Sequence, residues 1–156
     1  MRETDITTLI ESAARLGPFS DNTARSYRQL APRLTALVNE RMLKREDVLL
    51  LTGIENTDMM KDNHANHARF IASILDRFHP GVLTETIIWV FRAYRSRGFA
   101  SAYWAAQLNA WIETIQDEMP AEAGREVLGL YYWMQVNIPL FDKLSQASEK
   151  TPDQIH

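Results

Sequence analysis

Two of the four histidines, His64 and His67, lie three residues apart and are the side chains with the clearest potential for metal chemistry. On a helix this spacing brings both imidazoles to neighbouring positions, and Asp58 and Asp62 lie nearby. A di-iron bundle needs Glu-x-x-His motifs from two helices and a hydrolytic zinc helix needs His-Glu-x-x-His, whereas the chain has NHANHAR. We therefore expect no metal, and interpret the pair as solvated or hydrogen-bonded on a helix edge.

Patterns typical of catalysis are absent from the sequence. It has no Gly-x-Ser-x-Gly elbow, no phosphate-binding glycine loop and no dinucleotide fingerprint. Glu113 and Asp117, four residues apart, are more typical of a solvated helix face than of an acid–base pair. His79 precedes a proline at an expected helix end, where an imidazole often satisfies terminal carbonyls. The sequence favours a protein that is not an enzyme.

A cluster of basic and aromatic residues lies in the middle of the chain. Its composition suits a phosphate or a carboxylate. Helical spacing places the aromatic side chains inward and two of the arginines outward, which favours a solvated basic helix end instead. The cluster contains Arg92, Arg95, Arg97, Phe91, Tyr94 and Phe99.

Composition bounds the class of protein. A length of 156 residues suits one domain, and 17 Lys+Arg against 20 Asp+Glu, without a long run of like charge, argues against a nucleic-acid binder. Without cysteine there is neither a disulfide nor a thiolate metal site. No apolar run approaches the roughly 18 residues of a membrane span, and the N-terminus lacks a leader-like pattern. We expect a cytoplasmic protein without a membrane span.

Apolar residues recur at three- and four-residue steps without strand-like alternation, so we expect an all-α bundle of about six to seven helices. Residues 1–20 are expected to form an extension or a short helix, 21–148 the helical domain and 149–156 a flexible tail. Helix starts are expected at Asp5, at Asp21 or Asn22, at Asn56 or Thr57, at Ser101 and at Pro120, which opens a final helix that reaches Leu144. Helix ends are expected at Gly17-Pro18, Gly53, His79-Pro80 and Gly98. Pro32 is expected to kink or divide the helix that contains it.

The final helix is apolar on more than one side, which predicts a second buried surface. Its simplest occupant is a second copy of the chain, pairing the last two helices into a four-helix bundle. The alternative is a central helix surrounded by its own domain. The candidate interface residues are Trp111, Leu130, Tyr131, Trp133, Met134 and Ile138.

The segment YRSRGFASAYWAAQLNAW, residues 94–111, resembles the junction after the proximal helix of sensor globins. There a histidine precedes an aliphatic-Gly-Leu element and an aromatic pair. Gly98-Phe99 matches the Gly-Leu element and Tyr103-Trp104 matches the pair, while Tyr94 stands at the histidine position and Arg97 at the aliphatic one. The segment is also similar to the non-haem globin domains of bacterial stressosome co-antagonists, which lack the histidine and dimerise through their last two helices.

This resemblance implies a globin-like sensory or signalling domain without haem, acting through a dimer interface, with a downstream signalling partner and an apolar ligand as further expectations. Large side chains such as Phe91, Phe99, Trp104 and Trp111 would tend to fill a pocket. The main alternative is a haem or other tetrapyrrole binder using Tyr94, His64, His67 or His79 as ligand. A third is a helical interaction module without a ligand. The candidate pocket residues are Phe70, Ile74, Ile87, Phe91, Tyr94, Trp104 and Leu108.

Overall fold

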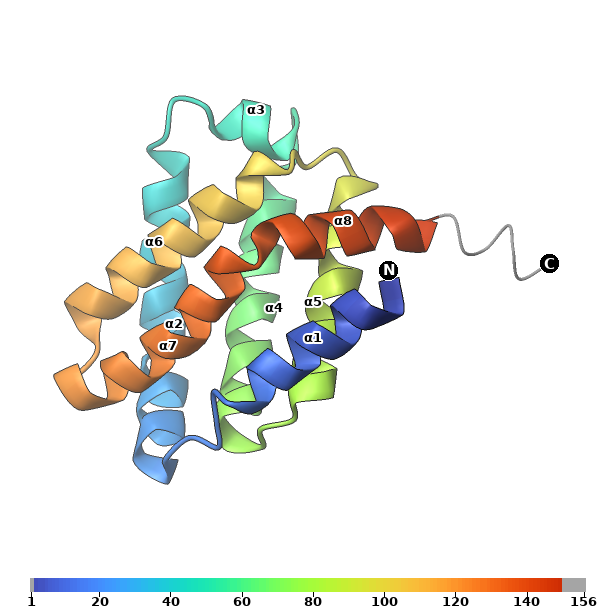
Figure 1. Ribbon diagram of the computed structural model, residues 1–156. Coiled ribbons are helices and arrows are strands. Elements are labelled where there is room, and N and C mark those ends of the chain that lie inside the picture. Colours follow the sequence, from blue (N-terminus) through green and yellow to red (C-terminus); the bar gives the residue numbers. More distant parts are fainter. Residues whose placement is uncertain (1, 150–156) are drawn as a thin grey trace.

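The computed structural model describes residues 2–149, and within this range the chain forms eight α-helices and no strand (Figure 1). The all-α prediction is confirmed. Residue 1 and residues 150–156 lie outside the described residues, which covers nearly all of the tail predicted at 149–156. The helices are α1 (Arg2–Ala14), α2 (Asp21–Leu43), α3 (Val48–Thr52), α4 (Thr57–Asp76), α5 (Pro80–Arg95), α6 (Ala102–Glu118), α7 (Ala121–Val136) and α8 (Ile138–Glu149).

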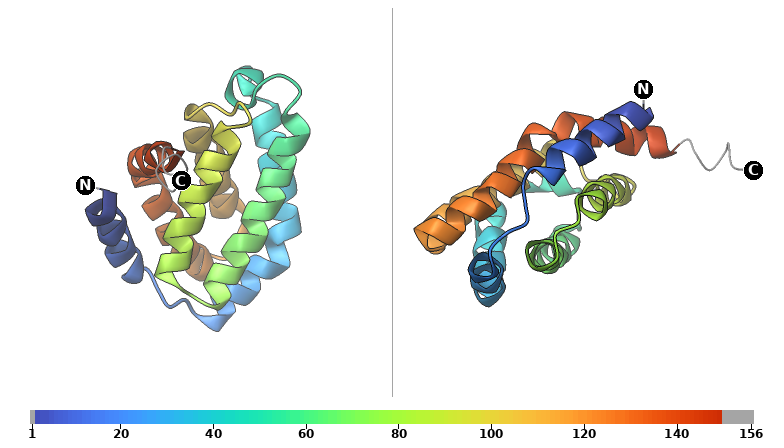
Figure 2. Two further views of the ribbon diagram at one scale, coloured as in Figure 1. Left: turned by 90° about the vertical axis from the view of Figure 1, so that its right-hand side faces the viewer. Right: turned by 60° about the horizontal axis from the view of Figure 1, so that its bottom comes forward.

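Helix α2 packs against α4, α6 and α7, whereas α5 packs against α1 and α8. Consecutive helices α4 and α5 run side by side in both views of Figure 2, but they are not among the helix pairs in close backbone contact. The backbones of α4 and α5 therefore lie further apart than those of the closely packed helix pairs. No helix within residues 2–149 has the length and apolar character needed to cross a bilayer.

The first two helices begin differently from the prediction. Asp5 lies within α1 and does not cap it, and the N-cap of α2 is Ser20 rather than Asp21 or Asn22. The Ser20 hydroxyl accepts a hydrogen bond from the backbone N–H of Thr23 at 3.2 Å, which satisfies one free donor of the first turn. Helix α2 also continues through Pro32 without division. The proline is exposed there, where a carbonyl that lacks its usual donor is open to water.

The predicted final helix is two helices, because the chain breaks at Asn137 between α7 and α8. The Asn137 side chain donates to the carbonyl of Trp133 at 2.8 Å, which satisfies one of the terminal carbonyls of α7. Pro139 lies in the first turn of α8, where its missing N–H is tolerated. The break allows α8 to lie against α5, with the rings of Phe91 and Phe141 5.6 Å apart.

The two apolar faces of this C-terminal segment are covered by the chain itself. Trp133 is 7% exposed, donates from Nε1 to the Ser12 hydroxyl of α1 at 2.8 Å and packs against Phe141. Leu9 and Ala13 of α1 are also buried, so α1 belongs to the core. The premise that one chain cannot bury both faces is therefore wrong. Of the predicted dimer residues, five are buried and one is half-buried: Trp111, Leu130, Tyr131, Trp133 and Met134, with Ile138 half-buried.

Two glycines make the turns that join the ends of α3 and α5 to the next helices. Gly53 and Gly98 have φ values of 92° and 100°, which residues other than glycine rarely adopt. Both predicted helix stops are confirmed. The Asn56 side chain bridges the two turns, donating to the carbonyls of Thr52 at 2.8 Å and Arg97 at 2.9 Å. These contacts set where α4 and α5 stand relative to each other.

Replacing Gly53 with alanine is expected to lower the free energy of unfolding by about 1–3 kcal/mol. Its backbone, at φ 92° and ψ 154°, suits glycine almost alone, and an added Cβ would lie 3.0 Å from Nδ2 of Asn56. The matched control is Gly129→Ala in α7, where the added methyl meets nothing within 4 Å and alanine favours the helix by about 0.5–1 kcal/mol. Urea unfolding of both variants measures the difference, and equal effects would contradict the prediction.

Candidate ligand-binding cavity

A cavity of about 500 Å³ lies between α4 and α5, with α6 behind it and one residue each from α7 and α8. Six of the seven predicted pocket residues line it: Phe70, Ile87, Phe91, Tyr94, Trp104 and Leu108. Ile74 does not, and lies buried in the core instead. Sequence periodicity identified the right helix faces because both the core and the cavity wall require apolar side chains.

One wall of the cavity is aromatic. Phe91 and Trp104 stack with ring centroids 4.5 Å apart and planes inclined by 10°, and Tyr94 meets Trp104 edge-on at 5.9 Å. Phe99 and Trp111 are buried outside the lining. The expectation that these large rings fill the pocket is therefore wrong, because stacking holds them against one another and leaves space in front of them.

The rim of the cavity is exposed and carries charge. Trp89 is 60% exposed, and Asp62, Asn66 and Arg97 are exposed as well, yet all four line the cavity. The cavity therefore communicates with the surface along the outer edges of α4 and α5. A ligand could enter there without unfolding of a helix.

The buried side of the cavity carries His67, which belongs to a chain of hydrogen bonds. Its Nε2 lies 2.8 Å from the Tyr131 hydroxyl, which lies 2.8 Å from the hydroxyl of Tyr27. Tyr27 is 0% exposed and has no other hydroxyl partner among the described residues, so its proton is used only if Tyr27 donates to Tyr131. Tyr131 then donates to Nε2 of His67. A neutral imidazole that accepts at Nε2 carries its proton on Nδ1.

His64 belongs to a second, separate chain. Its Nδ1 lies 2.6 Å from Oδ1 of Asn39 and its Nε2 lies 3.1 Å from the Tyr103 hydroxyl, which donates to Oδ1 of Asn63 at 2.7 Å. His64 is 0% exposed and does not line the cavity. The two histidines are thus hydrogen-bonded, as one alternative expected, but His64 lies in the interior and the half-buried His67 lies in the cavity wall, not on a solvated helix edge.

Burial lowers the pKa of His64 to about 3. Burial, together with the nearby His64, lowers the pKa of His67 to about 3 as well. Burial also raises the pKa of Tyr131 well above its usual value. Both imidazoles and the phenol are therefore neutral at physiological pH, so this part of the cavity offers neutral hydrogen-bonding groups.

Two buried donors of α6 lack a hydrogen-bond partner among residues 2–149. Nε2 of Gln107 and Nε1 of Trp111 have none, and Gln107, which is 1% exposed, lines the cavity. Gln107 was not among the residues predicted from the sequence to form a site. The available signal was a polar amide between Trp104 and Trp111 on the apolar stripe of α6, where a buried polar group without a partner is uncommon.

The remaining candidate residues lie elsewhere or have other partners. Nδ1 of His79 accepts from the backbone N–H of Val82 at 3.1 Å, so His79 caps the start of α5 and does not serve carbonyls at the end of α4. Within residues 2–149 no group of three His, Cys, Asp or Glu residues is arranged to hold a metal ion.

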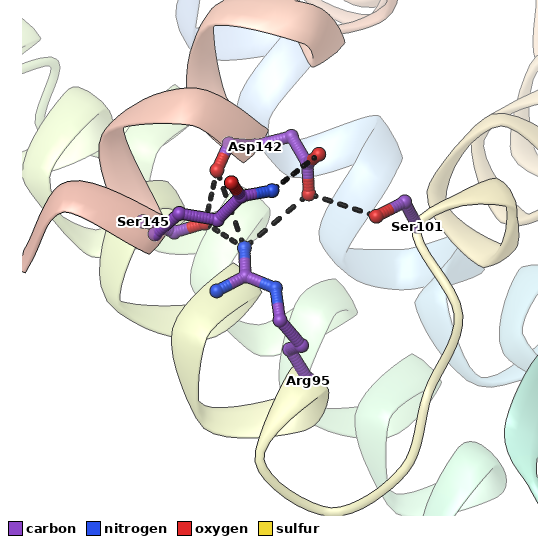
Figure 3. A network of polar contacts seen from close by, with 5 residues as sticks. Arg95, Ser101, Asp142 and Ser145 are labelled. Atoms are coloured by element: carbon purple, nitrogen blue, oxygen red, sulfur yellow. Dashed lines mark hydrogen bonds and ion pairs between the residues drawn. The ribbon is translucent and has the colours of Figure 1, made fainter. Parts of the chain in front are cut away.

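Arg95 is engaged in helix packing. Figure 3 shows its guanidinium reaching α8, where it donates to the carbonyl and carboxylate of Asp142 at 3.2 and 3.3 Å and to the Ser145 hydroxyl. Ser101 is the N-cap residue of α6, as predicted, but its hydroxyl donates to the same carboxylate at 3.0 Å and makes no capping hydrogen bond to its own helix. Of the three clustered arginines, Arg97 is the one that lines the cavity.

No protein-family model matches the chain, and no curated protein or solved structure shows significant similarity to it.

Proposed function

We propose that the chain is a globin-like sensory domain that works without haem and binds an apolar small molecule between α4 and α5. The observation that carries this proposal is the cavity of about 500 Å³ with its stacked aromatic wall. Ligand pockets commonly enclose roughly 300–1,000 Å³ and combine apolar walls with a few polar groups. The aromatic wall and the neutral polar groups around His67 fit that description.

The position of the cavity suits signalling by changes in packing. Its wall includes Met134 of α7 and Phe141 of α8 as well as residues of α4, α5 and α6. An occupant therefore contacts the helices that pack on α2, which are α4, α6 and α7, and also α5 with its neighbour α8. His67 and Asn63 also connect the wall to α2, through Tyr27 and Asn39. Binding that favours one arrangement of these groups would shift the packing of α2 and α8. A downstream protein would detect that shift.

A tetrapyrrole is the second candidate ligand. His67 and Tyr94 line the cavity from the two helices that face each other, and both residue types can bind haem iron. Nε2 of His67 is hydrogen-bonded to Tyr131, so this histidine would offer Nδ1. Arg97 at the rim could meet a propionate. Coordination of haem iron by Nδ1 requires the His67 proton to lie on Nε2, which would then donate to the Tyr131 hydroxyl. This is the reverse of the proton order described above.

Filling the cavity is expected to abolish binding of an apolar probe. Ala93 lines the cavity from α5, and Ala93→Trp would place an indole in the space, so the affinity for 1-aminoanthracene should fall by more than roughly tenfold. The matched control is Val82→Trp, which adds the same group to the same helix at a position 46% exposed and outside the cavity. Fluorescence titration measures the probe's Kd. Equal binding by all three proteins would reject the cavity as the binding site.

Haemin separates the two candidate ligands. We expect no stoichiometric Soret band when haemin is added to the purified protein. A band that is lost on His67→Gln or Tyr94→Phe would replace the proposed haem-independent function with the tetrapyrrole alternative.

A further inference from the structure

We infer that the ligand of this cavity carries a neutral carbonyl oxygen on an aromatic body, and that Gln107 and His67 donate hydrogen bonds to that oxygen. This inference rests on the proposed function, because it requires that the cavity bind an apolar molecule. It adds the chemical class of the ligand and the two side chains that orient it.

Gln107 is positioned by the crossing of α4 and α6. Tyr103 bonds to Asn63 at one end of this contact, and Trp111 packs against His67 at the other, with ring centroids 4.8 Å apart. Gln107 lies between Tyr103 and Trp111 at four-residue steps along α6, so all three share one helix face. Gln107 and His67 both line the cavity, and the Gln107 amide nitrogen is buried without a partner among the described residues.

An unpartnered buried amide nitrogen is a strong indication of a missing acceptor. Leaving such a donor unsatisfied is unfavourable, and native proteins seldom keep one without a purpose. A ligand oxygen in the cavity would satisfy it.

His67 supplies the second donor. The proton order imposed by Tyr27 and Tyr131 leaves the His67 proton on Nδ1, which has no hydrogen-bond partner among the described residues. His67 also lines the cavity, and it contacts Trp111 one turn from Gln107. Two residues from different helices that line the cavity thus each have an N–H group without a partner, which suits one oxygen with two lone pairs.

Gln107 and His67 carry no charge, so this pair favours binding of a carbonyl over binding of a carboxylate. The charged lining residues Asp62 and Arg97 are both exposed at the rim. Gln107 is neutral, and His67 resists protonation because burial lowers its pKa. A carboxylate bound between them would lose its hydration without gaining a counter-charge, whereas a carbonyl gains two hydrogen bonds and carries no net charge.

Three naphthalenes of matched shape test the class of ligand. 2-Acetylnaphthalene has the carbonyl, 2-isopropylnaphthalene replaces it with a methyl group, and 2-naphthoate replaces it with a carboxylate. Calorimetric titration of the full chain should show the ketone binding roughly tenfold more tightly than the hydrocarbon, as two hydrogen bonds allow, and more tightly than the acid. The carbonyl infrared stretch of the bound ketone should lie at the lower wavenumber of a hydrogen-bonded carbonyl.

Gln107→Met identifies the donor, since methionine has a similar length without an N–H group. The variant should bind the ketone about threefold to tenfold more weakly and the hydrocarbon with unchanged affinity, while the carbonyl stretch moves back toward its unbonded position. Its Tm without ligand should equal or exceed that of the wild type, because the change removes an unpartnered buried donor. If methionine packs poorly, Gln107→Leu provides a second substitution, which should also weaken binding of the ketone and leave binding of the hydrocarbon unchanged.

The outcomes separate this inference from the function on which it rests. Equal affinity for ketone and hydrocarbon would overturn the carbonyl inference and leave the apolar cavity as the binding site. Tightest binding of 2-naphthoate, lost on Arg97→Gln, would overturn it in favour of a carboxylate held at the rim. Failure of all three naphthalenes and of 1-aminoanthracene to bind would overturn both proposals.

Discussion

Acidification from pH 7 to pH 5 is expected to lower the free energy of unfolding by about 2–4 kcal/mol, well before the carboxylates are protonated. The cause is the buried His64 and the half-buried His67. Both are neutral in the folded chain because burial lowers their pKa to about 3, whereas in the unfolded chain a histidine titrates near 6.5.

The sign of the effect follows from which state binds the protons. Between pH 6.5 and about 3 the unfolded chain takes up protons at His64 and His67 that the folded chain does not. Stability is therefore greatest above pH 6.5 and falls as the pH decreases through this window, by up to about 1.4 kcal/mol per pH unit for each histidine. His64 should account for the larger part, because it is 0% exposed whereas His67 borders the cavity.

Urea unfolding at pH 7.5, 6 and 5 measures this dependence. His64→Gln should reduce the pH dependence of the free energy of unfolding by at least half. The double variant His64→Gln/His67→Gln should remove nearly all of that dependence. A wild-type stability that is constant from pH 7 to pH 5 would show that the folded interior accommodates the imidazolium.

Removal of the Tyr131 hydroxyl is expected to destabilise the protein by about 2–5 kcal/mol, although the ring itself is retained. Tyr131→Phe leaves two buried groups without partners, the hydroxyl of Tyr27 and Nε2 of His67, which both lie 2.8 Å from the deleted oxygen. Each unsatisfied buried group is unfavourable by about 1–3 kcal/mol. Tyr27→Phe removes only the end of the chain, so it should destabilise by about 0.5–1.5 kcal/mol.

The double variant gives the sharper test. In Tyr27→Phe/Tyr131→Phe the orphaned Tyr27 hydroxyl is gone, so this protein should be more stable than Tyr131→Phe alone. Chemical unfolding at pH 7.5 of the wild type and the three variants completes the thermodynamic cycle. A double variant less stable than Tyr131→Phe would refute the view that loss of the Tyr131 hydroxyl leaves the Tyr27 hydroxyl unsatisfied.

Several features of the fold could be predicted from local sequence because they depend on local physical chemistry. Gly53 and Gly98 end helices because their backbones take positive φ values, which the residue type alone suggests. The pocket candidates Phe91, Trp104 and Leu108 follow from helical periodicity, which identifies the inward face of a helix. That periodicity cannot tell a filled interior from a cavity wall, so the cavity itself required the structure.

Other features depend on contacts between distant parts of the chain. Asn137 ends α7 within a continuous apolar pattern, and its only sequence signal was the nearby Pro139. The break and the docking of α1 through Ser12 cover the faces that had suggested a dimer. The burial of His64 and the lack of a partner for Gln107 likewise appear only once α4 and α6 cross.

The sequence by itself determined the helical class, the approximate helix order and the inward faces, because propensity, periodicity and turn residues act over a few positions. The tertiary structure alone decided which polar side chains on those faces have partners. Hydrogen-bond satisfaction depends on atoms from different helices meeting within about 3 Å, and no local pattern encodes that distance. His67 and Gln107 illustrate this division, since the sequence offered His67 only as a metal or haem candidate and Gln107 not at all, whereas their N–H groups without partners support the proposed ligand site.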